Sequence, residues 1–181
     1  MKKIVLTYGL ISGVFFAVEF LITLGFADTI GHENGYVIGY TTMVAAFLLV
    51  YFGMRSYRDT VLNGVIKFGA AFRVGILITL LSSTMYVASW EIVSSKLAPD
   101  FAAKYAAHEI ERAKAAGVSQ EKLDAQVKKM KDFEVMYKNP FIFAGLTFLE
   151  VFPVGLVITL ISAGVVSRRG RDGATANPIA V

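Results

Sequence analysis

Long apolar blocks alternate with polar segments along the chain, and this pattern predicts four membrane-spanning helices. Each block holds about 19 to 27 residues, and at about 1.5 Å per residue a helix of that length crosses a hydrocarbon core of about 30 Å. Because lipid offers the backbone no hydrogen-bond partner, we expect helices rather than strands. The predicted spans cover about residues 4–27, 36–54, 68–90 and 140–166.

The polar segment between the third and fourth blocks predicts two further helices outside the membrane. Pro99 and Asp100 are typical of a helix start and Gly117 of a helix end. Ser119 can then cap a second helix. We therefore expect an all-α integral membrane protein of four transmembrane helices, with a helical hairpin inserted at about residues 95–138. One face of the second hairpin helix is apolar and carries Leu123, Val127, Met130, Phe133 and Tyr137.

The sequence predicts where the fourth span begins, and the residues after it have the composition of a disordered tail. Asn139 can cap the helix, and Pro140 suits its first position. Gly, Arg and Ala are frequent after Ser167, which is typical of disorder. The predicted organisation is a four-helix membrane domain over residues 1–167, which contains the hairpin, and a disordered cytoplasmic tail over residues 168–181.

The first apolar block has an alternative interpretation as a signal peptide. Lys2 and Lys3 give it a basic start, and residues 25–27 loosely resemble a cleavage site. Its apolar run, however, exceeds 20 residues and contains Glu19, whereas the apolar region of a signal peptide holds about 7 to 15 residues. We favour a retained first helix.

Composition and charge add to the membrane interpretation and narrow the chemistry. The apolar share is 55% and the formal net charge is +4. The basic residues lie mostly beside the apolar blocks or alternate with acidic ones, which favours membrane orientation over nucleic-acid binding. Cysteine is absent, which excludes thiolate chemistry and disulfides. No phosphate-binding glycine loop, nucleophile elbow or metalloprotease helix is present, so we expect neither an enzyme nor a cofactor or metal.

The distribution of Lys and Arg predicts that both termini face the cytoplasm. Basic clusters precede the first span, fill the connection between the second and third, and follow the fourth. The hairpin segment carries nine basic residues on the predicted outer side, but seven acidic residues are interleaved with them. The clusters consist of Lys2, Lys3, Arg55, Arg58, Lys67, Arg168, Arg169 and Arg171.

Two carboxyl side chains, Glu19 and Glu150, are predicted at similar depth in the membrane, about 12 and 15 Å from the outer side. A charge near the bilayer centre costs at least about 2.5 kcal/mol, so such residues mark candidate sites. Thr147 lies one turn before Glu150, and Pro153 after it frees the carbonyl of Leu149. The two carboxyls, the threonine and the proline form a candidate polar site. It either handles a proton, ion or ligand, or holds the helices together through hydrogen bonds.

Arg73 lies about one and a half turns from the cytoplasmic end of the third span. Helical side chains lean toward the helix N-terminus, which here is the cytoplasmic side. We therefore favour a side chain that reaches the lipid headgroups over one that pairs with Glu150. Together with Arg55, Arg58 and Lys67 it forms a candidate contact surface for anionic lipid.

Weaker signals concern helix packing and the membrane interface. Glycine pairs at positions 9–13 and 35–39 match the small-xxx-small spacing of closely packed helices. Tyr86 and Trp90 lie near the end of the third predicted span, which is typical of the interfacial aromatic belt.

Several short segments, in their order along the chain, give a resemblance to a known family. They are Trp90 and residues 53–59 (GMRSYRD), 64–75, 99–101 (PDF), 137–140 (YKNP), 147–155 (TFLEVFPVG) and 160–169. In these segments the chain resembles a bacterial membrane protein family, the domain of unknown function 4199 (DUF4199). The resemblance covers most of the chain from the second span onward and implies a bacterial inner-membrane protein, without an activity, substrate or catalytic residue.

Two functional hypotheses follow from the sequence. The first is a non-enzymatic membrane protein whose external hairpin binds an unidentified membrane partner or stabilises a homo-oligomer. The second is a small transporter or proton-coupled component that uses Glu19 and Glu150, as a dimer because four helices are few for one transport path. A lipid-modifying enzyme has no nucleophile, base or metal set to support it.

Overall fold

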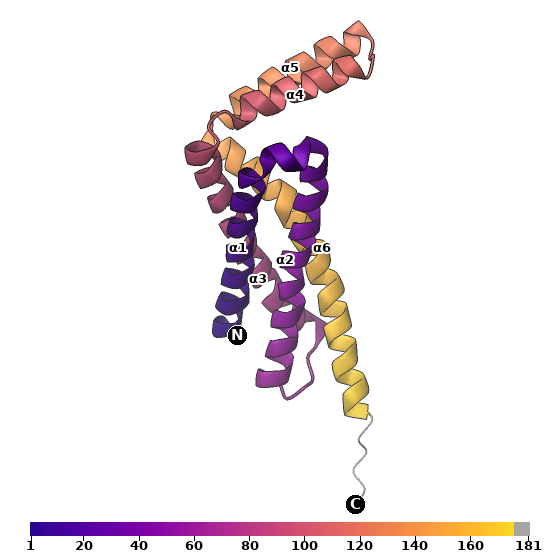
Figure 1. The fold of residues 1–181 in the computed structure, drawn as a ribbon. Helices are drawn as coiled ribbons and strands as arrows, with labels where there is room; N and C mark the ends of the chain where they lie inside the picture. Colours follow the sequence, from indigo (N-terminus) through magenta and orange to yellow (C-terminus); the bar gives the residue numbers. More distant parts are fainter. Residues whose placement is uncertain (176–181) are drawn as a thin grey trace, which may run out of the picture. The chain divides into compact units, whose positions relative to one another are not determined.

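The computed structural model describes residues 1–175, except for the side chains of residues 27–34, 36 and 169–175. All regular structure in this part of the chain is helical (Figure 1). The elements are α1 (Lys2–Gly25), α2 (Ala27–Val61), α3 (Phe68–Ile92), the π-helical turn η1 (Val93–Leu97), α4 (Phe101–Ala115), α5 (Gln120–Tyr137) and α6 (Pro140–Thr175).

Four of the described helices are long and apolar enough to cross a membrane, as the block pattern predicted. They cover Lys2–Gly25, Val37–Val61, Phe68–Leu97 and Pro140–Arg168. The chain is therefore an all-α protein with the composition of a multi-pass membrane protein.

Element boundaries differ from the prediction at four places. The second candidate span continues to Val61 rather than residue 54, and the third to Leu97 rather than residue 90. Only Phe26 separates α1 from α2, so the expected connection after the first span has a helical backbone. At the other end of the chain, α6 continues to Thr175, where we expected a disordered tail from residue 168. Arg and Ala are good helix formers, and no proline interrupts the chain before Pro178. Residues 176–181, the rest of the predicted tail, lie outside the described part.

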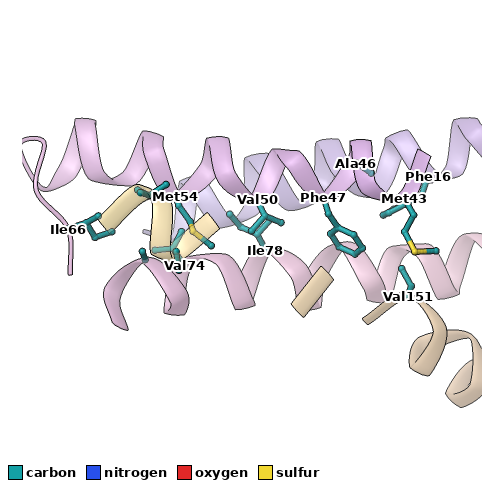
Figure 2. Packing of buried hydrophobic residues seen from close by; sticks show 13 residues of the cluster. Phe16, Met43, Ala46, Phe47, Val50, Met54, Ile66, Val74, Ile78 and Val151 are labelled. Carbon is teal, nitrogen blue, oxygen red and sulfur yellow. The ribbon is translucent and has the colours of Figure 1, made fainter. Parts of the chain in front are cut away.

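The chain divides into two compact units, and the first holds residues 1–89 and those from 148 onward. We call it the bundle unit. Its core side chains come from α1, α2, α3 and α6, and Figure 2 shows Val50 of α2 beside Ile78 of α3. Phe47, Val50, Ile78 and Val151 have no exposed surface. Between membrane helices such contacts stabilise through van der Waals packing, because lipid is as apolar as the core.

Glycines allow the helices of the bundle unit to approach closely. A Cβ atom built on Gly9 would lie 2.6 Å from Leu81 of α3, and one on Gly155 of α6 would lie 2.6 Å from Thr79 of α3. A Cβ atom on Gly13 would likewise collide with the side chain of Met85. The predicted glycine pair at positions 9 and 13 therefore lies at a helix contact. Around the other pair, positions 35–39, a Cβ would meet nothing within 4 Å among the described residues.

Hydroxyl groups link the same helices. Thr79 of α3 and Thr159 of α6 are both buried, and their Oγ1 atoms lie 2.7 Å apart. Ser12 of α1 donates to the Ala46 carbonyl of α2 at 3.2 Å, and Ser82 of α3 donates to the Gly9 carbonyl at 3.4 Å. Such bonds contribute about 0.6 kcal/mol each in membrane bundles.

The second unit covers Trp90–Thr147 and contains α4 and α5, which lie side by side (Figure 1). We call it the α4–α5 unit. The predicted apolar face of α5 points at α4: Met130 is 4% exposed, and the ring of Phe133 lies 5.4 Å from that of Tyr105. Ring contacts then continue through Phe101 and Tyr137 to Phe143 at the start of α6.

The predicted helix ends in this unit agree with the structure in position. α4 ends before Gly117, whose φ of 64° suits glycine. Asn139 Oδ1 accepts hydrogen bonds from the backbone N–H groups of Phe141 and Ile142 at 3.1 and 3.3 Å, as a helix cap does. Asp100 and Ser119 occupy N-cap positions without a capping bond from their side chains.

Candidate functional sites in the two units

Glu19 lies half-buried on α1 and has a local partner. The hydroxyl of Thr23, one turn further along α1, donates to Glu19 Oε1 at 3.0 Å. This bond lies within one helix. It therefore satisfies part of the carboxyl without joining two helices.

Glu150 lies on the outward face of α6. Its side chain is exposed, and no hydrogen bond or ion pair joins it to another described residue. Its neighbours on this face are apolar, with Leu149 67% exposed and Val157 54% exposed. Pro153 is also on this face, inside an otherwise continuous helix. A carboxyl in an apolar outward stripe of a membrane span requires water, a proton or a partner molecule.

Thr147, the remaining residue of the predicted polar site, is buried. It is 5% exposed, whereas Glu150, three residues further along α6, is exposed. Residues three apart are neighbours on a helix surface, so Thr147 lies at the buried border of the face that exposes Glu150.

Tyr86 of α3 interacts electrostatically with both Glu19 and Glu150, which the sequence pattern did not predict. Its ring is held by Phe16 and Phe20 of α1, at centroid distances of 5.0 and 4.8 Å. The sequence predicts an interfacial position for Tyr86, and the third candidate span continues past it to Leu97. The phenol of Tyr86 is therefore coupled to each of the two carboxyls.

The four predicted lipid-contact cations fall into two pairs. Arg55 and Arg58 both approach Asp59, with N–O distances of 3.5 and 2.7 Å. Arg58 has a side chain only 13% exposed and also donates to the Val166 carbonyl of α6 at 3.4 Å. Lys67 and Arg73 are exposed. Lys67 and Arg73 have no ion pair with a described side chain and are the two suited to lipid contact, whereas Arg58 joins α2 to α6.

A pocket of about 290 Å³ lies within the α4–α5 unit, and no sequence pattern pointed to it. Two polar atoms there, Glu91 Oε1 and the Tyr137 hydroxyl, are buried and have no hydrogen-bond partner among the described residues. A buried polar atom left unpaired costs about 1 to 3 kcal/mol, so these atoms are suited to a ligand or water. The lining residues are Glu91, Ser94, Ser95, Pro99, Tyr137, Lys138, Pro140 and Phe143.

The π-helical turn η1 shapes one wall of this pocket. Ser94 and Ser95 each donate to the Glu91 carbonyl, at 3.3 and 2.6 Å. Single π-helical turns are frequent at functional sites, because the extra residue widens the helix. Burial raises the pKa of the Tyr137 hydroxyl, and the nearby Glu91 carboxyl raises it as well. Tyr137 is therefore a neutral hydroxyl at physiological pH, able to donate or to accept a hydrogen bond.

Comparison with known families agrees with the resemblance found in the sequence. A family model described as a protein of unknown function (DUF4199) matches residues 6–168. The chain belongs to the DUF4199 family. No curated protein and no solved structure matches it. The DUF4199 match covers the first candidate span from residue 6, the other three spans, both carboxyls and the pocket, but supplies no activity for any of them.

Proposed function

We propose that this DUF4199 protein is a non-enzymatic, multi-pass protein of a bacterial inner membrane that associates with a partner or with itself. Both termini lie in the cytoplasm, and α4 and α5 form a hairpin on the outer side of the membrane. The basic clusters near the chain ends and around the C-terminal end of α2 support this orientation. Lys67 and Arg73 then contact anionic headgroups on the cytoplasmic side.

The observation that carries this proposal is that α4 and α5 bury their apolar faces against each other. Met130, Phe133 and Tyr105 face inward, so the helical pair needs no lipid to cover it. Its outer faces carry charges of both signs. They also carry a small exposed apolar patch, formed by Val135 and Met136, which are 68% and 36% exposed. A water-compatible pair with a small apolar patch is suited to docking another protein.

Deleting residues 100–136 and joining the ends should abolish association. The wild-type chain in mild detergent is expected to elute as an oligomer or with a co-purifying partner, and the deletion variant as a monomer. Light scattering coupled to size exclusion measures both masses.

A substitution and a truncation sharpen this test. Val135→Asp places a charge on the exposed apolar patch. It should weaken association and leave the helix content of the chain unchanged. A chain ending at Arg168 keeps α4 and α5 and should associate as the wild type does. If the deletion variant keeps its oligomeric mass or partner, α4 and α5 are not the association element.

A proton-coupled component is the second candidate, and the position of Tyr86 favours it. In the bundle unit Tyr86 interacts electrostatically with Glu19 and with Glu150, so one phenol is coupled to two carboxyls. Carboxyls in such surroundings are typical proton carriers in membrane proteins. Transport along this route needs a second copy to enclose the exposed side of Glu150.

Infrared difference spectroscopy tests the proton-coupled candidate. A protonated-carboxyl band is expected to titrate between about pH 5 and pH 9. The band should shrink in Glu150→Gln and persist in the exposed-surface control Glu111→Gln. Absence of any titrating carboxyl in that range removes this candidate, and it leaves the association proposal in place.

A further inference from the structure

The pocket of the α4–α5 unit has the polar groups to recognise a small zwitterion. Glu91 Oε1 is a buried acceptor without a partner, and the Tyr137 hydroxyl beside the pocket is also unpaired among the described residues. Lys138 lines the same pocket and supplies a positive charge. An ammonium group can donate hydrogen bonds to Glu91 Oε1 and to the Tyr137 oxygen, and an anionic group can pair with the Lys138 ammonium.

The type of ammonium is restricted by these acceptors. A primary ammonium has three N–H donors and can bond both Glu91 Oε1 and the Tyr137 oxygen. A quaternary ammonium has none and would leave both oxygen atoms unpaired. The aromatic ring of Phe143 in the lining adds a face suited to a cation.

The pocket lies where lipid headgroups are expected. Glu91 falls within the last turns of the third candidate span, and Pro140 begins the fourth. Exposed apolar side chains belong to the same short segments: Ile92 is 63% exposed, Leu97 54% and Phe141 88%. Acyl chains can cover such side chains while a headgroup enters the pocket, and the volume of about 290 Å³ suits a headgroup rather than a whole lipid.

We propose that this pocket binds an aminoethyl-phosphate group, with its ammonium at Glu91 and Tyr137 and its phosphate at Lys138. The source of the group is a membrane lipid, phosphatidylethanolamine. The α4–α5 unit thereby reads the headgroup composition of the outer leaflet, a property independent of protein association.

Native mass spectrometry of the full chain with added lipids tests this site. Phosphatidylethanolamine should remain bound at least about tenfold more strongly than phosphatidylcholine, which lacks N–H donors. Glu91→Gln should lower that affinity about tenfold, because it removes the charge from the main acceptor. Glu111→Gln, an exposed carboxyl of α4 outside the pocket, should leave it unchanged.

Competition by soluble O-phosphoethanolamine separates the two sources of the group. Displacement of the bound lipid supports headgroup recognition. Binding of the soluble compound alone would support the zwitterion site and overturn the lipid source.

Should Glu91→Gln fail to fold, Tyr137→Phe removes one hydroxyl and is expected to weaken binding about threefold to tenfold. Equal binding of the two lipids, or binding indifferent to both substitutions, overturns the proposal.

Discussion

Replacing Gly75 with leucine is expected to unfold the four-helix bundle under conditions where the wild-type chain is stable. A Cβ atom at Gly75 would overlap the terminal methyl of Met54 and lie 3.0 Å from Thr159 Cγ2 and 3.2 Å from Val50 Cγ1. Met54 is flexible and can move aside. The other two neighbours are β-branched and stiff.

Thr159 is fixed further by its hydrogen bond to Thr79, at 2.7 Å. A leucine at position 75 therefore has to push α3 away from both α2 and α6, and that movement breaks the threonine pair. Overpacking alone costs about 1 to 3 kcal/mol, and with the lost bond we expect more than about 3 kcal/mol. Thermal melting in detergent, followed by circular dichroism, measures the effect.

Gly69→Leu is the matched control for this substitution. It lies on the same helix, is exposed, and a Cβ there would meet nothing within 4 Å. Its stability should change by less than about 0.5 kcal/mol. If the two variants melt alike, α2, α3 and α6 do not meet at Gly75.

The sequence predicted the features that depend on local pattern. Run length and hydropathy are properties of consecutive residues, so the four spans could be predicted from them. The inward face of α5 followed from helical periodicity, because its apolar residues recur on the side that contacts α4 and polar residues occupy the other sides. The cap at Asn139 depends on the next three residues alone and was predicted on the same basis.

The candidate sites depend on contacts that periodicity does not mark. A membrane helix is apolar on all sides, so its pattern cannot tell which face packs inward, and the exposed side of Glu150 was not foreseen. The pocket brings Glu91 together with Tyr137, far along the chain, through a π-helical turn that has no sequence signature. The third candidate span continues to Leu97, past the end near residue 90 that the apolar block predicted.

Glu150→Leu is expected to favour membrane insertion of α6 by about 3 kcal/mol, the difference between a charged side chain and leucine at a helix centre. The insertion efficiency of the isolated α6 segment, measured by glycosylation mapping, reports this change. The melting temperature of the whole bundle should not fall, because Glu150 has no hydrogen bond or ion pair to lose among the described residues.

Glu19→Leu supplies the contrast, since the same chemical change occurs where the carboxyl has a partner. It removes the acceptor of the Thr23 hydroxyl within α1, so the bundle should lose about 0.5 to 1.5 kcal/mol while insertion of α1 improves. A drop in melting temperature for Glu150→Leu as large as that for Glu19→Leu would mean that Glu150 has a stabilising partner in the bundle. The melting temperature of Glu150→Leu is expected to stay unchanged or to rise, and its infrared carboxyl band to disappear. Such a result would mean that Glu150 disfavours membrane insertion of α6 and is kept for another reason. Because the fold does not need this carboxyl, its role must then lie in proton handling or in contact with a second molecule.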